Sequence, residues 1–289
     1  MSSPYYLRYY DPPEHLQRYI LVLFHFYSTK KDVSDRNPGA HPQLILCPQG
    51  TGGMRFPDGR YDRLGRVNLA GGMSTAIPFD VSGPWHTIGA TLSPLGWAAL
   101  TGVPLRDHMD RFFDPEELLG PEITSFADDV NERYLSGELS GQATGYALCD
   151  WIAERLKPIK PEHEALIEQT LDWLGKSLNP PLEGLYERMS YSRRQTERLV
   201  ERYFGSPPAA LARKYRAIRA AALLAQPKLS DRTQAIIAAA FHDRPHMVHE
   251  ISRYCAHTPT RLGGDEDPIL VTLLQMKNFQ RLQLFNNIK

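Results

Sequence analysis

The stretch SRRQTERLVERYFG, residues 192–205, determines how the C-terminal part of the chain is expected to fold. Its apolar and small side chains recur at the spacing of one helix face: Thr196, Leu199, Val200, Tyr203 and Phe204. Charged side chains occupy the outward face at i, i+3, i+4 and i+7: Arg194, Glu197, Arg198 and Glu201. Ser192 and Gln195 form a capping box, and Gly205 is a helix-stop residue. The stretch therefore predicts an amphipathic helix with outward-facing arginines.

A shorter helix is predicted just before this one. NPP (179–181) offers an asparagine cap followed by a proline suited to a first helical turn. LEGLYERM (182–189) supplies the short helix, and SY (190–191) turns the chain. Two short helices joined by a tight turn, of which the second exposes arginines, are typical of a helix-turn-helix.

The same pattern recurs about 50 positions later. An alanine-rich helix is predicted over 207–226, and Pro227 ends it. Ser230 then caps a helix over 231–241, the chain turns at 242–244, and another helix follows over 245–255. Its buried stripe is Met247, Ile251, Tyr254 and Cys255. The region is thus predicted to hold two helix-turn-helix units joined by one long helix.

The turn of the second unit, HDRPH (242–246), has the histidine spacing of a zinc-protease motif. His249, Cys255 and His257 follow it closely. However, Phe241 ends one helix and Pro245 suits the first turn of the next, so the two histidines do not share a helix face. We therefore predict no metal site here. Asp243 is instead expected to cap the second helix, with His246 as a polar residue at its start.

Composition places the chain among globular proteins with room for two domains. It has 289 residues, of which 42% are hydrophobic and 23% charged, and its formal net charge is zero. Residues 184–262 nevertheless carry 14 Lys and Arg against 6 Asp and Glu, which leaves 19 against 27 for the rest. This division suggests a basic functional region, although chance clustering of solvated charge gives the same count.

No secretory or membrane segment is predicted. The N-terminus is polar and aromatic, and the longest apolar run, 19–27, is too short to span a bilayer. The three cysteines are odd in number and far apart, which argues against a disulfide framework. We therefore expect a cytoplasmic protein.

The N-terminal part is predicted to be an antiparallel β-barrel or sandwich of the cupin-like kind. Turn signals at 48–53, 57–60, 70–72 and 82–84 separate β-prone runs at 18–27, 43–47, 66–70 and 85–92. Helical patterns follow at 94–100, 122–135 and 144–156, and a proline-rich segment at 156–164 suggests a boundary. The fold class is α+β, with a β-rich domain over 1–157, an all-α domain over 164–262 and a tail over 263–289.

The C-terminal region resembles the AraC/XylS family of bacterial transcription regulators. The second helix-turn-helix is in register with that family's signature at Ile237, Ala238, Phe241, Asp243, His246, Ile251, Pro259 and Arg261, and the first at Ser192, Arg198, Phe204, Gly205 and Pro208. Ala240 and Ala256 stand where glycines are usual, Met247 and Ile251 replace aromatics, and Leu262 replaces a tyrosine. An alanine at a positive-φ position is strained, so the second unit is expected to be less ideal. The N-terminal part resembles, more loosely, the small β-barrel sensor domains that precede such regions.

The resemblance implies that double-stranded DNA is the partner. Side chains expected to meet bases are Arg194, Glu197 and Arg198 in the first unit, and Arg244, Pro245, Val248 and His249 in the second. Side chains expected to hold phosphates are Arg193, Arg202, Arg213, Lys214 and Arg253. For each of them the alternative is a solvated surface side chain. A homodimer is expected, with RNA polymerase as a further partner if the protein is an activator.

Three roles remain open for the N-terminal domain: binding a small effector, catalysis, or dimerisation and docking without a ligand. The chain has no H-x-H pair, and His25, His41 and His86 are isolated, so we expect no catalytic residue, metal or cofactor. His25 and His86 are better interpreted as hydrogen-bonded core histidines. A ligand pocket could be lined by His25, Tyr27, Trp85 and Trp97, or these could simply be core. The partly amphipathic tail, 267–289, either packs back on the protein or pairs with another subunit.

Overall fold

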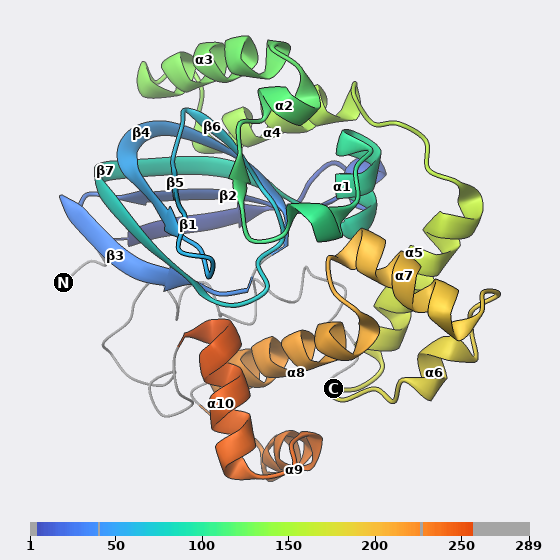
Figure 1. Cartoon of the computed structure of the whole chain (residues 1–289). Helices are drawn as coiled ribbons and strands as arrows, with labels where there is room; N and C mark the ends of the chain where they lie inside the picture. The colour runs from blue at the N-terminus through green and yellow to red at the C-terminus, as the bar shows by residue number, and fades with distance from the viewer. Residues whose placement is uncertain (1–4, 40, 226–227, 257–289) are drawn as a thin grey trace. The chain divides into compact units, whose positions relative to one another are not determined.

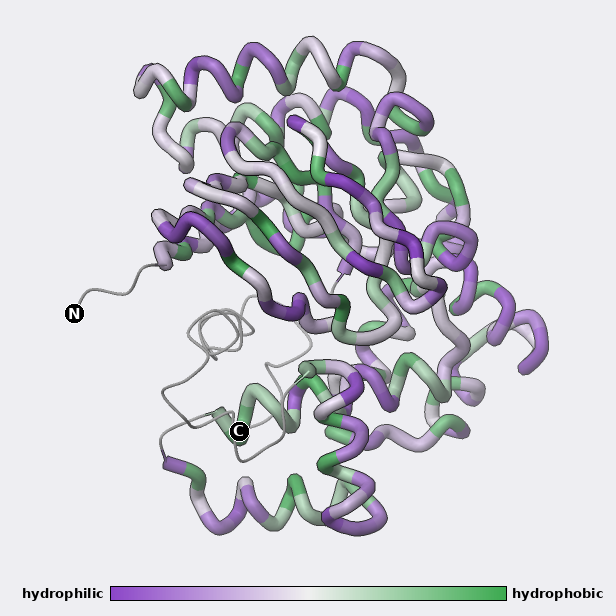
Figure 2. The backbone as a smooth tube through the Cα atoms, turned by 60° about the vertical axis from the view of Figure 1, so that its left-hand side comes forward, coloured by the Kyte–Doolittle hydropathy of each residue, from purple (hydrophilic) through white to green (hydrophobic). Residues whose placement is uncertain are grey.

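The computed structural model describes residues 5–39, 41–225 and 228–256. The chain divides into two compact units, and each is considered by itself. The first comprises residues 1–35, 41–73 and 77–159, and the second comprises 36–40, 74–76 and 160–289. Figure 1 labels the helices and strands, and Figure 2 shows hydrophilic and hydrophobic residues alternating along the helices, as their one-sided burial requires.

The first unit is built on one antiparallel sheet of eight strands in the order β1-β2-β7-β4-β6-β8, with β3 paired to β7 and β5 to β4. The strands are β1 (Tyr5–Tyr10), β2 (Ile20–Ser28), β3 (Asp32–Asn37), β4 (Gln43–Arg55), β5 (Tyr61–Arg63), β6 (Val67–Ala70), β7 (Ile77–Leu92) and β8 (Phe112–Phe113). The predicted antiparallel β-rich fold is confirmed.

Two predicted turns, PQGTGG (48–53) and SGP (82–84), are wrong, because these residues lie inside β4 and β7. The pairing of these two strands shifts register on both sides of Gln49, which marks a bulge. Gly52 has a φ of 156°, and a Cβ on it would stand 2.1 Å from the carbonyl oxygen of Asp80. Its glycine is therefore required by close approach of the two backbones, and not by a chain reversal.

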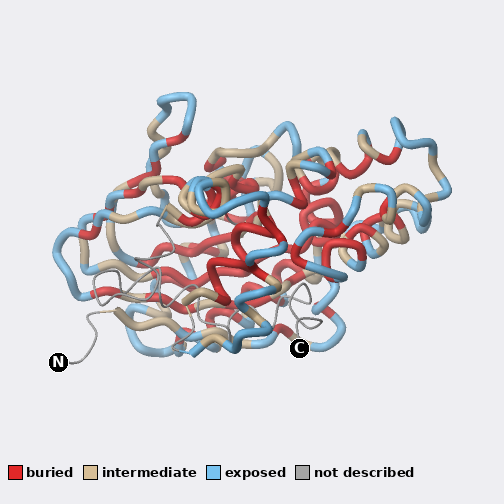
Figure 3. The backbone as a smooth tube through the Cα atoms, turned by 90° about the horizontal axis from the view of Figure 1, so that it is seen from below, coloured by how far each residue is buried: buried red, intermediate tan, exposed pale blue. Residues whose placement is uncertain are grey.

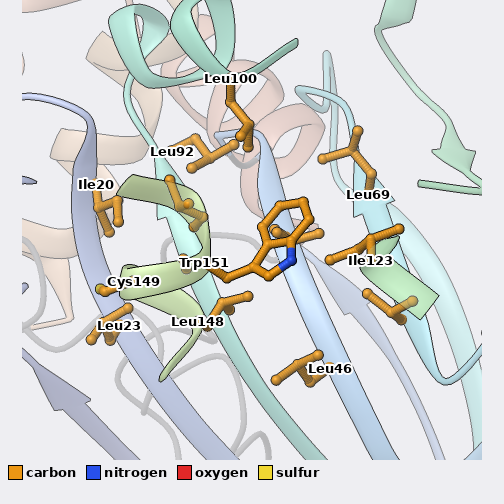
Figure 4. Packing of buried hydrophobic residues seen from close by; sticks show 14 of the residues in the cluster. Ile20, Leu23, Leu46, Leu69, Leu92, Leu100, Ile123, Leu148, Cys149 and Trp151 are labelled. Carbon is orange, nitrogen blue, oxygen red and sulfur yellow. The ribbon is translucent and has the colours of Figure 1, made fainter. Parts of the chain in front are cut away.

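Helices α3 (Glu122–Leu135) and α4 (Gly141–Ala153) pack on one face of this sheet. Trp151 of α4 lies among Leu46 and Leu69 of the sheet and Ile123 of α3 (Figure 4). Each such aliphatic side chain contributes about 1.5–3 kcal/mol when it is fully buried. The unit also contains α1 (Pro94–Thr101), α2 (Glu116–Leu119) and the 3₁₀ turns η1 (Glu14–Leu16) and η2 (Leu105–His108).

From Lys160 to Ala256, the second unit contains only helices among the residues that the structure describes. Its helices are α5 (Pro161–Gly175), α6 (Glu183–Tyr186), α7 (Arg193–Phe204), α8 (Pro208–Leu224), α9 (Asp231–Ala240) and α10 (Arg244–Cys255). Figure 3 shows their buried and exposed stretches in red and pale blue. The two predicted helix-turn-helix units are confirmed as α6–α7 and α9–α10, joined by α8. Pro227, predicted to end the joining helix, and the tail lie outside the described residues.

Helix α7 forms as its sequence pattern predicts. Its buried side chains are the five of the predicted stripe: Thr196, Leu199, Val200, Tyr203 and Phe204. The Ser192 hydroxyl accepts a hydrogen bond from the backbone N–H of Gln195 at 3.4 Å. Gly205 ends the helix with a φ of 74°, the left-handed conformation that glycine adopts without steric cost.

The predicted cap at Asn179 is wrong. Helix α6 begins only at Glu183, and Leu182 precedes it without a side-chain cap. The Asn179 side chain instead accepts a hydrogen bond from Arg216 of α8, with 2.9 Å between Oδ1 and Nη1. Asn179 is therefore used for a tertiary contact, and local helix-start patterns cannot distinguish the two uses.

Arg216 is buried, and it links several elements of the second unit. Its guanidinium donates to both carboxylate oxygens of Glu250 in α10, at 2.6 Å from Nη2 to Oε1 and 3.0 Å from Nε to Oε2. Its Nη1 also donates to the carbonyl oxygen of Ala240, at the end of α9. Only 7% of Arg216 and 5% of Glu250 is exposed. One side chain of α8 thus holds both helices of the second helix-turn-helix, and Asn179 from the segment before the first.

A second buried arginine, Arg219, lies one turn further along α8. Its Nη1 donates to the carbonyl oxygens of Leu174 and Ser177 at 2.8 Å each, so it caps the end of α5. Burial lowers the pKa of Arg219 to about 10, which leaves it charged at neutral pH. Together the two arginines attach α8 to α5, which precedes it in the chain, and to α9 and α10, which follow it.

Breaking the Arg216 pair is expected to destabilise the second unit. Glu250→Gln leaves a buried guanidinium without its counter-charge, which typically costs about 3–5 kcal/mol. Hydrogen exchange of α8 and α10 amides in the full chain measures this loss. Asp172→Asn, an exposed change on α5, should alter protection by less than about 0.5 kcal/mol. Unchanged protection in Glu250→Gln would show that the pair does not hold the helices.

The two alanines at usual glycine positions differ in conformation. Ala256 has a φ of 65°, as the expectation of strain requires, whereas Ala240 is an ordinary helical residue. We therefore expect Ala256→Gly to stabilise the unit by up to about 1 kcal/mol and Ala240→Gly to destabilise it by at least about 0.5 kcal/mol. Urea unfolding of both variants tests the opposite signs; the same sign in both would refute the conformational explanation.

Candidate nucleic-acid interface

Arg194 and Arg198 form an exposed pair of guanidinium groups on α7. They lie four residues apart, on the face opposite the buried stripe. Neither makes any of the hydrogen bonds or ion pairs found among the described residues. Their forked donors are therefore available to a ligand with paired acceptors.

Glu197, predicted to lie with them, is held differently. Its Oε1 accepts a hydrogen bond from the Tyr186 hydroxyl of α6 at 2.8 Å. Arg193 stacks on the Tyr186 ring, with its guanidinium carbon 4.4 Å from the centroid, and its Nε lies 3.6 Å from the same carboxylate oxygen. Burial, and then the bond to Glu197, raise the pKa of Tyr186, so the phenol keeps the proton that it donates. Tyr186 was not predicted as a site residue.

The second helix-turn-helix presents a less charged surface at the start of α10. The Asp243 carboxylate accepts from the backbone N–H of His246 at 2.7 Å, which confirms the predicted cap. This bond, and a second with His242, lower the pKa of Asp243. The base-contact candidates of this helix are exposed except for the half-buried Val248: Arg244, Pro245, Val248 and His249.

The phosphate candidates are spread over three helices. Arg213 on α8 and Arg253 on α10 are exposed, and Lys214 is half-buried. Arg202 is half-buried and lies over the Tyr203 ring at 5.9 Å. Arg193 belongs to the cluster with Tyr186, so it is restrained by contacts within the protein.

The HDRPH histidines do not converge. His242 lies 3.2 Å from its neighbour Asp243, whereas His246 Nε2 lies 3.1 Å from Glu250 Oε1, one turn along α10. Across the described ranges, no three or more His, Cys, Asp or Glu side chains are grouped as metal ligands would be. His257 lies outside those ranges.

The four predicted pocket residues of the first unit do not gather at one place. Trp97 of α1 is fully buried, and its Nε1 donates to the carbonyl oxygen of Val103. Trp85 packs on Phe26, whose neighbours His25 and Tyr27 point to the other face of the sheet. His25 and Tyr27 therefore share a face and Trp85 lies on the other, whereas Trp97 belongs to the core cluster that includes Leu23.

A three-residue chain of hydrogen bonds lies on the His25 face. The Tyr134 hydroxyl of α3 is 2.8 Å from His25 Nε2 and 2.8 Å from His86 Nδ1. Burial lowers the pKa of His25 to about 4 and that of His86 as well, and it raises the pKa of Tyr134 to about 12. All three side chains are thus neutral at pH 7. Both histidines make the predicted hydrogen bonds, but only His25 is buried in the core, whereas His86 is half-buried. Tyr134 lies in the predicted helix at 122–135, but local periodicity does not reveal its strand partners, because they are remote in sequence.

This cluster predicts acid sensitivity of the first unit. The folded pKa of His25, about 4, lies below its unfolded value of about 6.5, so the unfolded chain binds the proton first as pH falls. Stability is then complete above about pH 6.5 and declines toward pH 4. Tryptophan-monitored thermal unfolding at pH 7.5 and 5.0 measures this, and His25→Gln should flatten the dependence. His15→Gln, at an exposed site, should keep it; equal flattening by both variants would refute the assignment.

The C-terminal helices match one known protein family. A model described as a helix-turn-helix domain matches residues 185–263. No curated protein matches the chain. Among the described residues, no helix is long and apolar enough to cross a membrane.

Solved structures of ToxT from Vibrio cholerae are similar at low identity. One, from strain O395, has a TM-score of 0.46 at 8% identity and covers 90% of this chain and 97% of its own. Another, bound to (E)-4-(8-methylnaphthalen-1-yl)but-3-enoic acid, has a TM-score of 0.46 at 9% identity, and the match covers 94% of this chain and 100% of that one. A third, bound to an unsaturated fatty acid, has a TM-score of 0.44 at 9% identity, and the match covers 90% of this chain and 95% of that one. Likeness this low carries no information on ligands.

The family match covers the helices that carry the arginine pair and the capped second helix. It begins at Leu185 in α6 and extends past the end of α10. The C-terminal region of this chain is an AraC-type helix-turn-helix domain, which follows an antiparallel β-rich unit.

Proposed function

We propose that the protein is a sequence-specific DNA-binding regulator of transcription. The observation that carries the proposal is the exposed Arg194 and Arg198 pair on α7, which has no intramolecular partner in the described structure. An arginine fork matches the O6 and N7 acceptors that guanine presents in the major groove. The preceding helix α6 and the tight turn give α7 the position of a recognition helix.

The second helix-turn-helix supports a two-part site. Helix α10 begins at the Asp243 cap and exposes Arg244, Pro245 and His249 at its start. Half-buried Val248 offers a methyl group that suits a thymine methyl. Because α8 connects the two helix-turn-helix units, and its Arg216 holds α10 and the Asn179 segment that precedes α6, we infer that α7 and α10 enter successive major grooves on one DNA face, about 34 Å apart.

Phosphate contacts supply the remaining affinity in this proposal. Arg202, Arg213, Lys214 and Arg253 carry positive charge near the recognition helices, and such contacts position a protein without specifying sequence. The proposed partner is double-stranded DNA in the cytoplasm, with RNA polymerase as a further partner of an activator. No catalytic step and no cofactor are part of the proposal.

Selection of bound DNA from a random pool tests the proposed function. We expect a two-part site whose centres lie about one helical turn apart, and affinity that falls steeply between 50 and 200 mM salt as counterions are released. Failure to enrich any sequence, or a dissociation constant unchanged by salt, would overturn the proposal.

Substitutions separate base contacts from phosphate contacts. Arg198→Ala should weaken specific binding by roughly 1–3 kcal/mol and relax preference at one position. Arg253→Ala should weaken all sequences equally and reduce the salt slope by about 1. Arg63→Ala, at an exposed site in the first unit, should change neither. Equal loss across all sequences in Arg198→Ala would assign that residue to phosphate.

For the first unit we propose control by a small effector. Of the predicted lining residues, His25 and Tyr27 remain candidates because they share a face with His86 and Tyr134. The alternative is a unit that only dimerises or docks a protein. Thermal stabilisation by members of a metabolite library would support an effector, whereas no shift would favour the alternative. A homodimer is also proposed; deletion of 267–289 followed by measurement of oligomer size tests whether the tail contributes.

A further inference from the structure

The two helices of the first helix-turn-helix, α6 and α7, are in contact through one glutamate, Glu197. Glu197 lies between Arg194 and Arg198 on the outward side of α7, where its carboxylate could accept from the N4 amino group of cytosine. Its Oε1 is instead occupied by the Tyr186 hydroxyl of α6 at 2.8 Å. This is a charge-assisted bond, whose typical strength corresponds to roughly tenfold to a hundredfold in population.

Arg193 reinforces the same arrangement. Its guanidinium covers the Tyr186 ring at 4.4 Å and lies 3.6 Å from Glu197 Oε1. The side chains of Arg193 and Glu197 are 62% and 44% exposed, so their ion pair alone is weak in water. The hydroxyl of Tyr186 is therefore the group that restrains the carboxylate most strongly.

We propose that Tyr186 is a specificity-determining positioning residue, which holds Glu197 against α6 and so leaves Arg194 and Arg198 as the only base-reading groups on this face of α7. The proposal rests on the proposed DNA-binding function. It follows that the first helix-turn-helix selects guanines, and that its preference for cytosine at the Glu197 position is suppressed by an intramolecular bond. Removing one oxygen atom should release that preference.

The experiment compares four full-length proteins by selection from a random DNA pool: wild type, Tyr186→Phe, Glu197→Ala and the double variant. Tyr186→Phe keeps the ring on which Arg193 stacks and removes only the hydroxyl. We expect it to raise the enrichment of cytosine about tenfold at one position of the first half-site. In the Glu197→Ala background, the same change should have no effect on base preference, because the freed carboxylate is absent.

Tyr191→Phe is the matched control, since it removes a hydroxyl from the turn that joins α6 and α7. It should reproduce the wild-type profile. A Tyr186→Phe profile identical to wild type, an equal loss at all positions, or a shift that persists without Glu197 would each overturn the inference while leaving the proposed function intact. A wild-type chain that enriches no sequence would overturn both.

Discussion

The buried ion pair between Arg216 and Glu250 is the constraint on which the C-terminal domain depends. A guanidinium removed from water is costly unless its charge and its donors are satisfied, and here a carboxylate, an amide oxygen and a carbonyl oxygen satisfy them. Those acceptors come from the segment before α6, from the end of α9 and from α10. The requirement to satisfy one charge therefore fixes the second helix-turn-helix, and the segment before the first, against α8.

Arginines in this domain thus serve two opposite purposes. On α8, Arg216 and Arg219 face inward, where burial and hydrogen bonding give rigidity. On α7, Arg194 and Arg198 face outward and have no partner within the described part of the chain, while the neighbouring Glu197 is restrained. A rigid interior and an unpaired basic surface are the two properties that a major-groove reader needs, because positional precision determines which base edges a fork can reach.

The sequence was sufficient where structure depends on local periodicity and capping. The α7 stripe, the Ser192 and Asp243 caps and the Gly205 stop are encoded within one or two helical turns. It was insufficient where a residue serves a partner far along the chain. Asn179 has the appearance of a cap and Glu250 that of a surface charge, and both bind Arg216. The glycine-rich segment 48–53 has the composition of a turn, yet its Gly52 allows strands β4 and β7 to approach each other closely. Such roles depend on tertiary contacts that periodicity does not record.

In the proposed complex, one rigid frame sets the distance between the two DNA-reading helices, α7 and α10. The measurement is the dissociation constant of the full chain for its selected site and for versions with two base pairs inserted between the half-sites. Two base pairs rotate one half-site by roughly a fifth of a helical turn and displace it by about 7 Å. We expect the insertion to weaken binding about tenfold or more, toward the affinity of a single half-site. An unchanged dissociation constant would contradict it, because the two units would then be moving independently.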